Sequence, residues 1–417
     1  MWITTLGFLI TGVGLPLLGV AALGISQSNG LFDLSSKAGR PYGMFFTCAL
    51  YLTIGPFFAI PRCATTSYTV GLEQILPEGH AKLFLLLFSA AFFAVTLFFS
   101  LRPGKILTWI GKVLNPCFLL FLGILLVVAL VSPGAAISSV EPMGNYATQP
   151  FLTGFLEGYN TMDALAGLAF GIIVVQVIQG LGVKEPEDVA VSTVRSGIFS
   201  CLLMAVIYLA VAVVGTQSRG LFPAAENGGI ALAQIAQHYL RGVGLLVLAA
   251  TVTLACLKTS VALITSCSET FVGLFPKGPS YRVWAIVFCL MSFVFANLGL
   301  STIISYAVPV LMFLYPLAIA LILLALFRQV LWPRPGGLRL HPGPDARRRR
   351  LRPAPQPPRK SPRPAASGRS DRSRGQCPAL SGIGFGWVCP AIIGLAIGLL
   401  LHFSRRKKAA DLIDLLL

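Results

Sequence analysis

The sequence predicts an all-α protein that crosses a membrane many times. Of its 417 residues, 55% are apolar and only 11% are charged, and the mean hydropathy is +0.80. Soluble domains carry about 25% charged residues, so a large soluble enzyme is excluded. Apolar stretches of about 20 residues, the length that crosses a bilayer core, recur along the chain. Because backbone groups in lipid must satisfy one another, we expect these stretches to be helices.

Ten such stretches can be recognised, nine before an Arg- and Pro-rich tract and one after it. The ranges are 3–24, 42–61, 82–101, 113–132, 156–181, 196–216, 243–268, 283–298, 301–327 and 381–403. Several contain Gly or Pro, as at Gly55-Pro56, Pro309 and Pro316. Packed membrane helices tolerate these residues, so they do not argue against the assignment.

The Lys and Arg residues of the connections predict the orientation. Cytoplasmic loops of membrane proteins carry an excess of these residues. Nine of them lie in the connections at 25–41, 102–112, 182–195 and 269–282. The alternate connections hold four, namely Arg62, Lys82, Arg219 and Arg241. The first group is therefore predicted to be cytoplasmic, and residue 1 is predicted to lie on the outer side.

Residues 329–380 hold most of the formal net charge of +17. This tract has 13 Lys and Arg against 2 acidic residues, and it contains 11 of the 28 prolines. Such a composition cannot bury enough apolar surface to fold, so the tract is predicted to be disordered. Two interpretations stay open: a tail that contacts anionic lipid, or off-frame translation of a stretch that encodes a membrane helix. Because so much of the charge lies in one tract, a nucleic-acid partner is not indicated.

The chain therefore divides into a transmembrane core at 1–328, the tract at 329–380, a final helix at 381–403 and a tail at 404–417. Ten spans would place the four basic residues 405–408 outside, against the charge rule. One more span before residue 1 and another within the tract would place both ends inside. We therefore expect an incomplete or altered version of a twelve-helix protein.

No constellation of catalytic or metal-binding residues is found in the sequence. The four His are far apart, the nine Cys form no C-x-x-C pair, and no H-E-x-x-H, G-x-S-x-G or Walker-type loop occurs. The sequence thus predicts neither an enzyme nor a bound cofactor. A channel and a membrane-embedded enzyme remain as alternatives to a carrier; a channel should show repeated pore-lining rings.

Two apolar stretches carry clusters of polar residues. The one at 156–181 begins EGYNTMDALAGLAFG, with Gly158, Asn160, Thr161 and Asp163. Discontinuous helices of this kind hold substrates in carriers, although Asp163 can also serve as a helix cap.

The second polar cluster is the triplet Lys258-Thr259-Ser260 within 243–268. Hydroxyls in membrane helices often bond their own backbone, which makes each of them weak evidence for a site. Lys258 lies mid-span and needs a partner. Asp163 is the most attractive partner by elimination.

Seven segments together resemble one family, the branched-chain amino-acid:cation symporters, which are the bacterial system II carriers for leucine, isoleucine and valine. The resemblance covers nearly everything outside 329–380, and the GP-x-F-A-x-PR and TMDALA strings are distinctive. The matching segments are GFLITGVGLPLLGVAAL (7–23), GPFFAIPRCATTSYTVG (55–71), PGKILTWIGKVLNP (103–116), EGYNTMDALAGLAFG (157–171), ACLKTSVALITSCSE (255–269), NLGLSTIISYAVPVLMFLYPLAIAL (297–321) and GIGFGWVCPAIIGL (382–395).

The resemblance implies a LeuT-like inverted repeat of five helices, followed by two extra helices. On that scheme 3–132 holds helices two to five, 156–327 holds six to ten, and 381–403 is helix twelve. Helices one and eleven would be absent, in agreement with the charge count. The implied function is multi-pass uptake of leucine, isoleucine or valine across the cell (inner) membrane, coupled to Na⁺ or H⁺. With helix one absent, we expect this chain to be inactive or severely impaired in transport.

The resemblance also implies which residues form the sites. Substrate would be bound by Gly158, Asn160, Thr161 and Asp163 on the sixth helix, and its side chain by Tyr51 on the third, for which a plain packing role is the alternative. The hydroxyls of Thr259 and Ser260 would ligate sodium. Lys258 stands where the family usually has threonine, so its ammonium could displace that ion.

Overall fold

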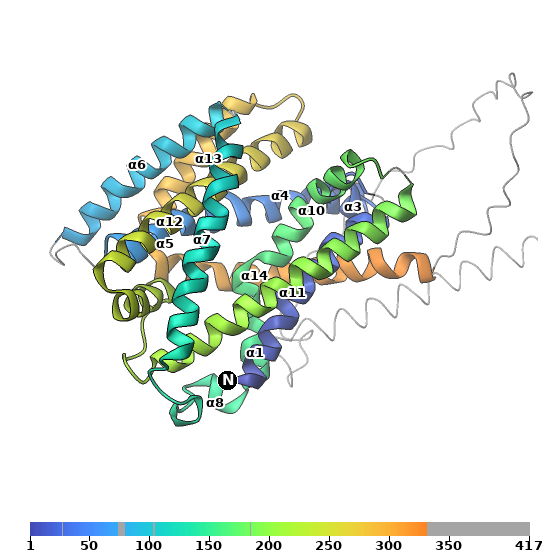
Figure 1. The fold of residues 1–417 in the computed structure, drawn as a ribbon. Coiled ribbons are helices and arrows are strands. Elements are labelled where there is room, and N and C mark those ends of the chain that lie inside the picture. Colours follow the sequence, from blue (N-terminus) through green and yellow to red (C-terminus); the bar gives the residue numbers. More distant parts are fainter. Residues whose placement is uncertain (27, 74–79, 103–104, 184, 332–417) are drawn as a thin grey trace, which may run out of the picture. The chain divides into compact units, whose positions relative to one another are not determined.

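The computed structural model describes residues 1–331 except for 27, 74–79, 103–104 and 184, and every regular element in this part is helical (Figure 1). The chain separates into two compact units, Met1–Leu326 and Phe327–Leu417. The account below concerns the first unit. The predicted helix at 381–403, the tail and all but the first residues of the basic tract lie outside the described residues. Residues 329–331 continue the last described helix.

The first half of the described chain contains three spans interrupted by short irregular turns and connections. Its elements are α1 (Trp2–Leu9), the π-helical η1 (Ile10–Gly14), α2 (Leu15–Ser26), α3 (Leu31–Ser36), α4 (Arg40–Leu52), the π-helical η2 (Thr53–Phe57), α5 (Ala59–Gly71), α6 (Ala81–Leu101) and α7 (Lys105–Val131).

The second half begins with short helices and continues with long ones. Its elements are η4 (Ile137–Ser139), α8 (Asn145–Thr148), α9 (Pro150–Glu157), η5 (Gly158–Thr161), α10 (Asp163–Gly180), α11 (Pro186–Ser218), α12 (Gly228–Leu274), α13 (Tyr281–Ala296) and α14 (Leu300–Leu331).

Seven helical segments of the described chain are long and apolar enough to cross a membrane. Two shorter apolar helices, Pro116–Val131 and Tyr281–Ala296, coincide with the predicted stretches at 113–132 and 283–298. An all-helical polytopic membrane protein is thus what the structure shows. Of the seven segments α11 is the least covered by protein, with 6% of its most apolar window buried, which is appropriate for a helix that faces lipid.

The span Arg40–Gly71 is broken in its middle and is longer than the sequence indicates. Gly55 has non-helical angles (φ −95°, ψ −120°) and is followed by Pro56, which lacks the N–H that a helix needs. The helix resumes as α5 and continues to Gly71. The predicted end at residue 61 is therefore wrong, and Arg62 belongs to a membrane helix instead of an outer loop. Removing Arg62 from the charge count leaves three outer basic residues and makes the predicted orientation stronger.

Helices far apart in sequence pack in two sets. In one set α1 packs along α9, and α2 along α10 and α11. In the other, α5 packs along α12, while α13 contacts both α6 and α12. The largest apolar core, with Leu23, Leu50, Leu168 and Tyr315, draws on α2, α4, α10 and α14. The broken part of the span 150–180 lies at the border of the two sets, as the contacts below show.

Candidate functional site

The span at 150–180 is discontinuous, as the sequence predicts. Helix α9 ends at Glu157, a 3-10 turn follows over Gly158–Thr161, and α10 starts at Asp163. Between them Met162 has the left-handed conformation (φ 59°, ψ 8°), which costs an ordinary residue about 1–2 kcal/mol. Within the described chain only Met162 and Arg241 have this sign of φ outside glycine. Strain of this kind is typical of functional sites.

A second irregular segment, η1, lies against this break. A Cβ atom at Gly158 would overlap the Thr11 hydroxyl and would approach the Gly12 nitrogen to 3.0 Å. Only glycine therefore allows the two backbones this approach. The Thr11 hydroxyl also donates a hydrogen bond of 2.7 Å to the Phe155 carbonyl. Two irregular segments of different spans are thus fixed side by side.

Arg62 satisfies a carbonyl group that the break would otherwise expose. The Thr161 hydroxyl donates to the Gly158 carbonyl (2.9 Å), and the Met162 amide donates to the Tyr159 carbonyl (3.1 Å). The Asn160 carbonyl accepts from Arg62 Nη1 at 2.7 Å. This bond joins α5 to η5 across 98 positions of the sequence. A cation in a membrane helix is expensive, which makes a residue with such a bond a candidate for function.

Asp163 has partners other than the one expected. Its Oδ2 accepts a hydrogen bond of 2.7 Å from the Tyr208 hydroxyl on α11, and the charge of Arg62 acts on it. Within the described residues no ion pair joins Asp163 to Lys258, so the pairing inferred by elimination is not formed. The carboxylate lies in the first turn of α10, where the helix dipole favours a negative charge.

Three tyrosines surround the break. The Tyr51 hydroxyl donates to the Ala169 carbonyl at 3.1 Å, and its ring meets Phe170 edge-on. The rings of Tyr159 and Tyr315 stack with centroids 4.0 Å apart, and both side chains are buried. Among the described residues the Tyr159 hydroxyl has no hydrogen-bond partner, whereas the Tyr315 hydroxyl interacts with the Thr161 hydroxyl and the Ala164 backbone. Because buried polar groups are almost always hydrogen-bonded, the Tyr159 hydroxyl indicates a place for a polar ligand.

The residues of the α12 cluster are separated by the helix. The Thr259 side chain is exposed and its hydroxyl donates to the Ala255 carbonyl at 3.0 Å. Ser260 is fully buried. Lys258 is partly buried. Within the described residues no hydrogen bond involves Lys258. The two hydroxyls thus lie on different faces, and that of Ser260, which points inside the protein, has the Cys63 thiol as its neighbour.

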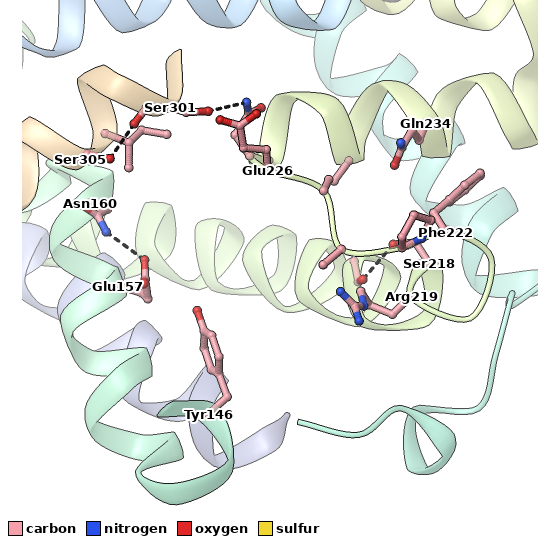
Figure 2. A pocket seen from close by; sticks show the side chains of 18 of the residues that line it. Tyr146, Glu157, Asn160, Ser218, Arg219, Phe222, Glu226, Gln234, Ser301 and Ser305 are labelled. Carbon is pink, nitrogen blue, oxygen red and sulfur yellow. Dashed lines mark hydrogen bonds between the residues drawn. The ribbon is translucent and has the colours of Figure 1, made fainter. Parts of the chain in front are cut away.

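A pocket of about 690 Å³ opens beside the break, and Figure 2 shows Glu157, Asn160 and Tyr146 along one of its walls. Arg62 contributes to its lining, as do residues at the end of α11 and at the starts of α12 and α14. Partial burial, and then the charge of Glu157, raise the pKa of the Tyr146 hydroxyl in the connection before α9. We call this space the outer pocket, since its rim belongs to the predicted outer connections.

Sequence reasoning missed four of the residues that build this site. Arg62 was assigned to a loop, whereas Tyr159, Tyr208 and Tyr315 lie in apolar stretches and attract no attention there. The signal available for Arg62 was its place in the GPFFAIPR string, where one basic residue follows an apolar run that continues after it.

Discontinuous membrane helices, a half-buried carboxylate beside the break and a polar pocket between packed helices are typical of the carrier class of membrane proteins. A family model described as "Branched-chain amino acid transport protein" matches residues 1–335. The chain therefore belongs to the family of branched-chain amino acid transport proteins, as the resemblance of its motifs predicts.

Several characterised relatives support this assignment. The branched-chain amino acid permease BrnQ of Lactobacillus delbrueckii subsp. lactis is 57% identical over 327 residues, which are 78% of this chain and 73% of the relative. BrnQ of Bacillus subtilis is 37% identical over 412 residues, 98% of this chain and 91% of the relative. The branched-chain amino acid transport system 2 carrier protein of Pseudomonas aeruginosa is 41% identical over 332 residues, 80% of this chain and 74% of the relative.

Proposed function

We propose that this chain carries leucine, isoleucine or valine across the cell (inner) membrane, together with a cation, by alternating access. The break between α9 and α10 carries the proposal. It leaves Asp163 and the hydroxyl of Tyr159 within a membrane protein whose relatives are named as permeases of these amino acids. The LeuT-like inverted repeat, with its two extra helices, is part of the same proposal.

The substrate-binding residues in this proposal are Tyr51, Gly158, Asn160, Thr161 and Asp163. The N-terminal end of α10 suits the carboxylate of an amino acid, because free amide groups and the helix dipole favour a negative charge there. Asp163 is the matching group for the ammonium. The part of the proposed site that holds the substrate side chain is apolar. An apolar site distinguishes two side chains that differ by one methylene by only about 1–3 kcal/mol of binding free energy. One carrier for all three substrates is the expected result.

Thr259 and Ser260 are the proposed cation-binding residues, with Lys258 beside them. Sodium prefers oxygen ligands, and the buried Ser260 hydroxyl, whose neighbour is the Cys63 thiol, can supply one. Lys258, two residues earlier on the same helix, is a positive charge that can take the place of the ion. The coupling ion is accordingly proposed as Na⁺ or H⁺, and no other cofactor is required.

Uptake of labelled leucine by proteoliposomes that contain only this chain tests the proposal. We expect saturable uptake that unlabelled isoleucine and valine inhibit and lysine does not, measured separately under a sodium gradient and a pH gradient. Comparison with a reconstituted relative also tests the expectation of impaired transport. Conductance without saturable uptake would favour a channel, and absence of uptake by a correctly folded chain would contradict the proposal.

A further inference from the structure

The outer pocket has properties that the proposed transport site does not use. Its walls come from elements far apart in the sequence: Glu157 and Asn160 at the break, Asn227 and Ala231 at the start of α12, and Ser301 at the start of α14. In Figure 2 Glu157 and Tyr146 face a space across which Phe222 and Arg219 lie. A volume of about 690 Å³ falls within the usual range of small-molecule sites, which is about 300–1,000 Å³.

Arg62 gives this pocket a cation with unused donors. A guanidinium group has five N–H donors. Within the described residues only Nη1 makes a hydrogen bond, to the Asn160 carbonyl. Arginine is the side chain best suited to a carboxylate, because two parallel N–H groups match its two oxygens.

Glu157 gives the pocket an anion with unused acceptors. Its Oε2 accepts from Asn160 Nδ2 at 2.9 Å, and the side chain is exposed to the pocket. In the described part of the chain no ion pair neutralises Glu157. Its charge acts on Arg62, so a positive and a negative group lie close enough to interact along one wall.

An apolar surface completes the lining. It consists of Phe222, Pro223, Ala224 and Ala225 after α11, Ala231 on α12 and Ile304 on α14. A small ligand with one positive group, one negative group and an aliphatic side chain matches these three surfaces. A purely ionic or a purely apolar ligand would leave one of them unmatched.

We propose that the outer pocket holds the zwitterionic amino acid before it reaches the break, with its carboxylate on Arg62, its ammonium on Glu157 and its side chain on the Phe222–Ala225 surface. This inference rests on the proposed function, since the occupant is the transported substrate. The unused N–H donors of Arg62 can bind the carboxylate while Nη1 keeps its hydrogen bond to the Asn160 carbonyl, so the docked amino acid lies directly beside the break.

Protection of a cysteine against labelling tests the proposal without measuring transport. Ala224→Cys in proteoliposomes is labelled with a membrane-impermeant maleimide, after subtraction of the wild-type background. We expect saturating leucine to slow labelling about tenfold, as for a site occupied about 90% of the time. Leucinol lacks the carboxylate, and 4-methylpentanoate lacks the ammonium, so neither should protect. Ser138→Cys, exposed in the same outer connections but outside the lining, should be labelled equally with and without leucine.

Two further variants assign the protection to the pocket. In the Ala224→Cys background, Glu157→Gln should abolish protection, whereas Glu141→Gln, an exposed outer carboxylate away from the lining, should not. Asp163→Asn should slow uptake yet keep protection, because Asp163 does not line the pocket. Absence of protection by leucine, equal protection by leucinol, or loss of protection in Asp163→Asn would each overturn the proposal. Uptake without protection refutes this inference alone, while protection without uptake refutes the proposed function.

Discussion

Arg62 and Lys258 are cationic side chains far from the ends of two membrane helices, and their surroundings differ. Arg62 on α5 donates to the Asn160 carbonyl at 2.7 Å, and the carboxylates of Glu157 and Asp163 act on it. Lys258 on α12 is also partly buried, but among the described residues no hydrogen bond or ion pair stabilises it. The two positions therefore differ in how strongly the structure around them depends on the charge.

The difference shows how a membrane protein can use a broken helix. The carbonyl groups of an intact helix are hydrogen-bonded within the helix, so a cation beside it, such as Lys258, finds no carbonyl acceptor and contributes little to the fold. A break leaves carbonyl groups without an intrahelical donor, and a cation that hydrogen-bonds to one of them stabilises the broken conformation. Arg62 and the break thus stabilise one another, which predicts large effects of mutation at Arg62 and small ones at Lys258.

The largest effect is expected for Arg62→Gln. The change removes the hydrogen bond that Arg62 donates to the Asn160 carbonyl and the positive charge that acts on Asp163, and a hydrogen bond that involves a charged group contributes about 1.5–3 kcal/mol. Because about 1.4 kcal/mol corresponds to a tenfold change, we expect leucine uptake to fall about 100-fold. Arg62→Lys keeps the charge but loses the planar fork, so it should recover only part of the uptake.

Two comparisons test this explanation. Arg282→Gln removes an exposed charge on the predicted cytoplasmic side and should change uptake by no more than about twofold, as surface substitutions usually do. The double variant Arg62→Gln with Asp163→Asn should unfold at a higher temperature in detergent than Arg62→Gln alone, because the uncompensated carboxylate is also gone. An equal loss of stability in the single and the double variant would mean that Arg62 acts independently of Asp163.

A smaller effect is expected at the contact between η1 and η5. In Gly158→Ala the added methyl group overlaps the Thr11 hydroxyl, and overpacking of this kind costs about 1–3 kcal/mol. We expect the thermal unfolding midpoint in detergent to fall by about 5 °C. Gly123→Ala is the matched control in α7, where nothing lies within 4 Å of the added carbon. Recovery of stability in the double variant with Thr11→Ala would confirm the contact, and no recovery would contradict it.

Tyr208→Phe is expected to have a moderate effect on substrate binding. It removes the 2.7 Å hydrogen bond to Asp163, and a hydrogen bond to a charged group contributes about 1.5–3 kcal/mol. If Asp163 binds the ammonium group, KM for leucine should rise about tenfold, while the unfolding midpoint changes little. Tyr239→Phe also loses a hydroxyl that donates to a carbonyl, that of Ser132 at 2.8 Å, and should leave KM unchanged. A rise in KM for both variants would show that the effect is not specific to Asp163.

Much of this fold can be predicted from the hydropathy of the sequence and from the positions of its glycines. The apolar stretches predict the helices, and the string around Gly158, Asn160 and Asp163 predicts the break at the place where Met162 turns left-handed. Both features depend on residues that are neighbours in the chain. The charge rule also predicts an orientation, and moving Arg62 into α5 strengthens it.

The contacts that build the site could not be predicted in this way. The partner of Arg62 is a backbone carbonyl, and every residue has one, so no residue type marks it. Tyr208 reaches Asp163 only because α11 packs beside α2 and α10 with a particular face, which hydropathy does not specify. Elimination among charged residues favoured Lys258 for Asp163, because Arg62 had been assigned to a loop and a tyrosine hydroxyl was not considered.

The smallest effect on stability, and the clearest effect on ion dependence, is expected for Lys258→Thr. Because no described hydrogen bond depends on the ammonium group, the free energy of unfolding should change by less than about 1 kcal/mol. If the ammonium takes the place of sodium beside Ser260, wild-type uptake should be the same in sodium and in choline medium, whereas Lys258→Thr should require sodium. Lys277→Thr, an exposed change on the predicted cytoplasmic side, should keep the wild-type behaviour. If uptake by the wild type already required sodium, the Lys258 ammonium would not occupy the sodium site. Arg62 and Lys258 would then differ only in how much each stabilises the fold.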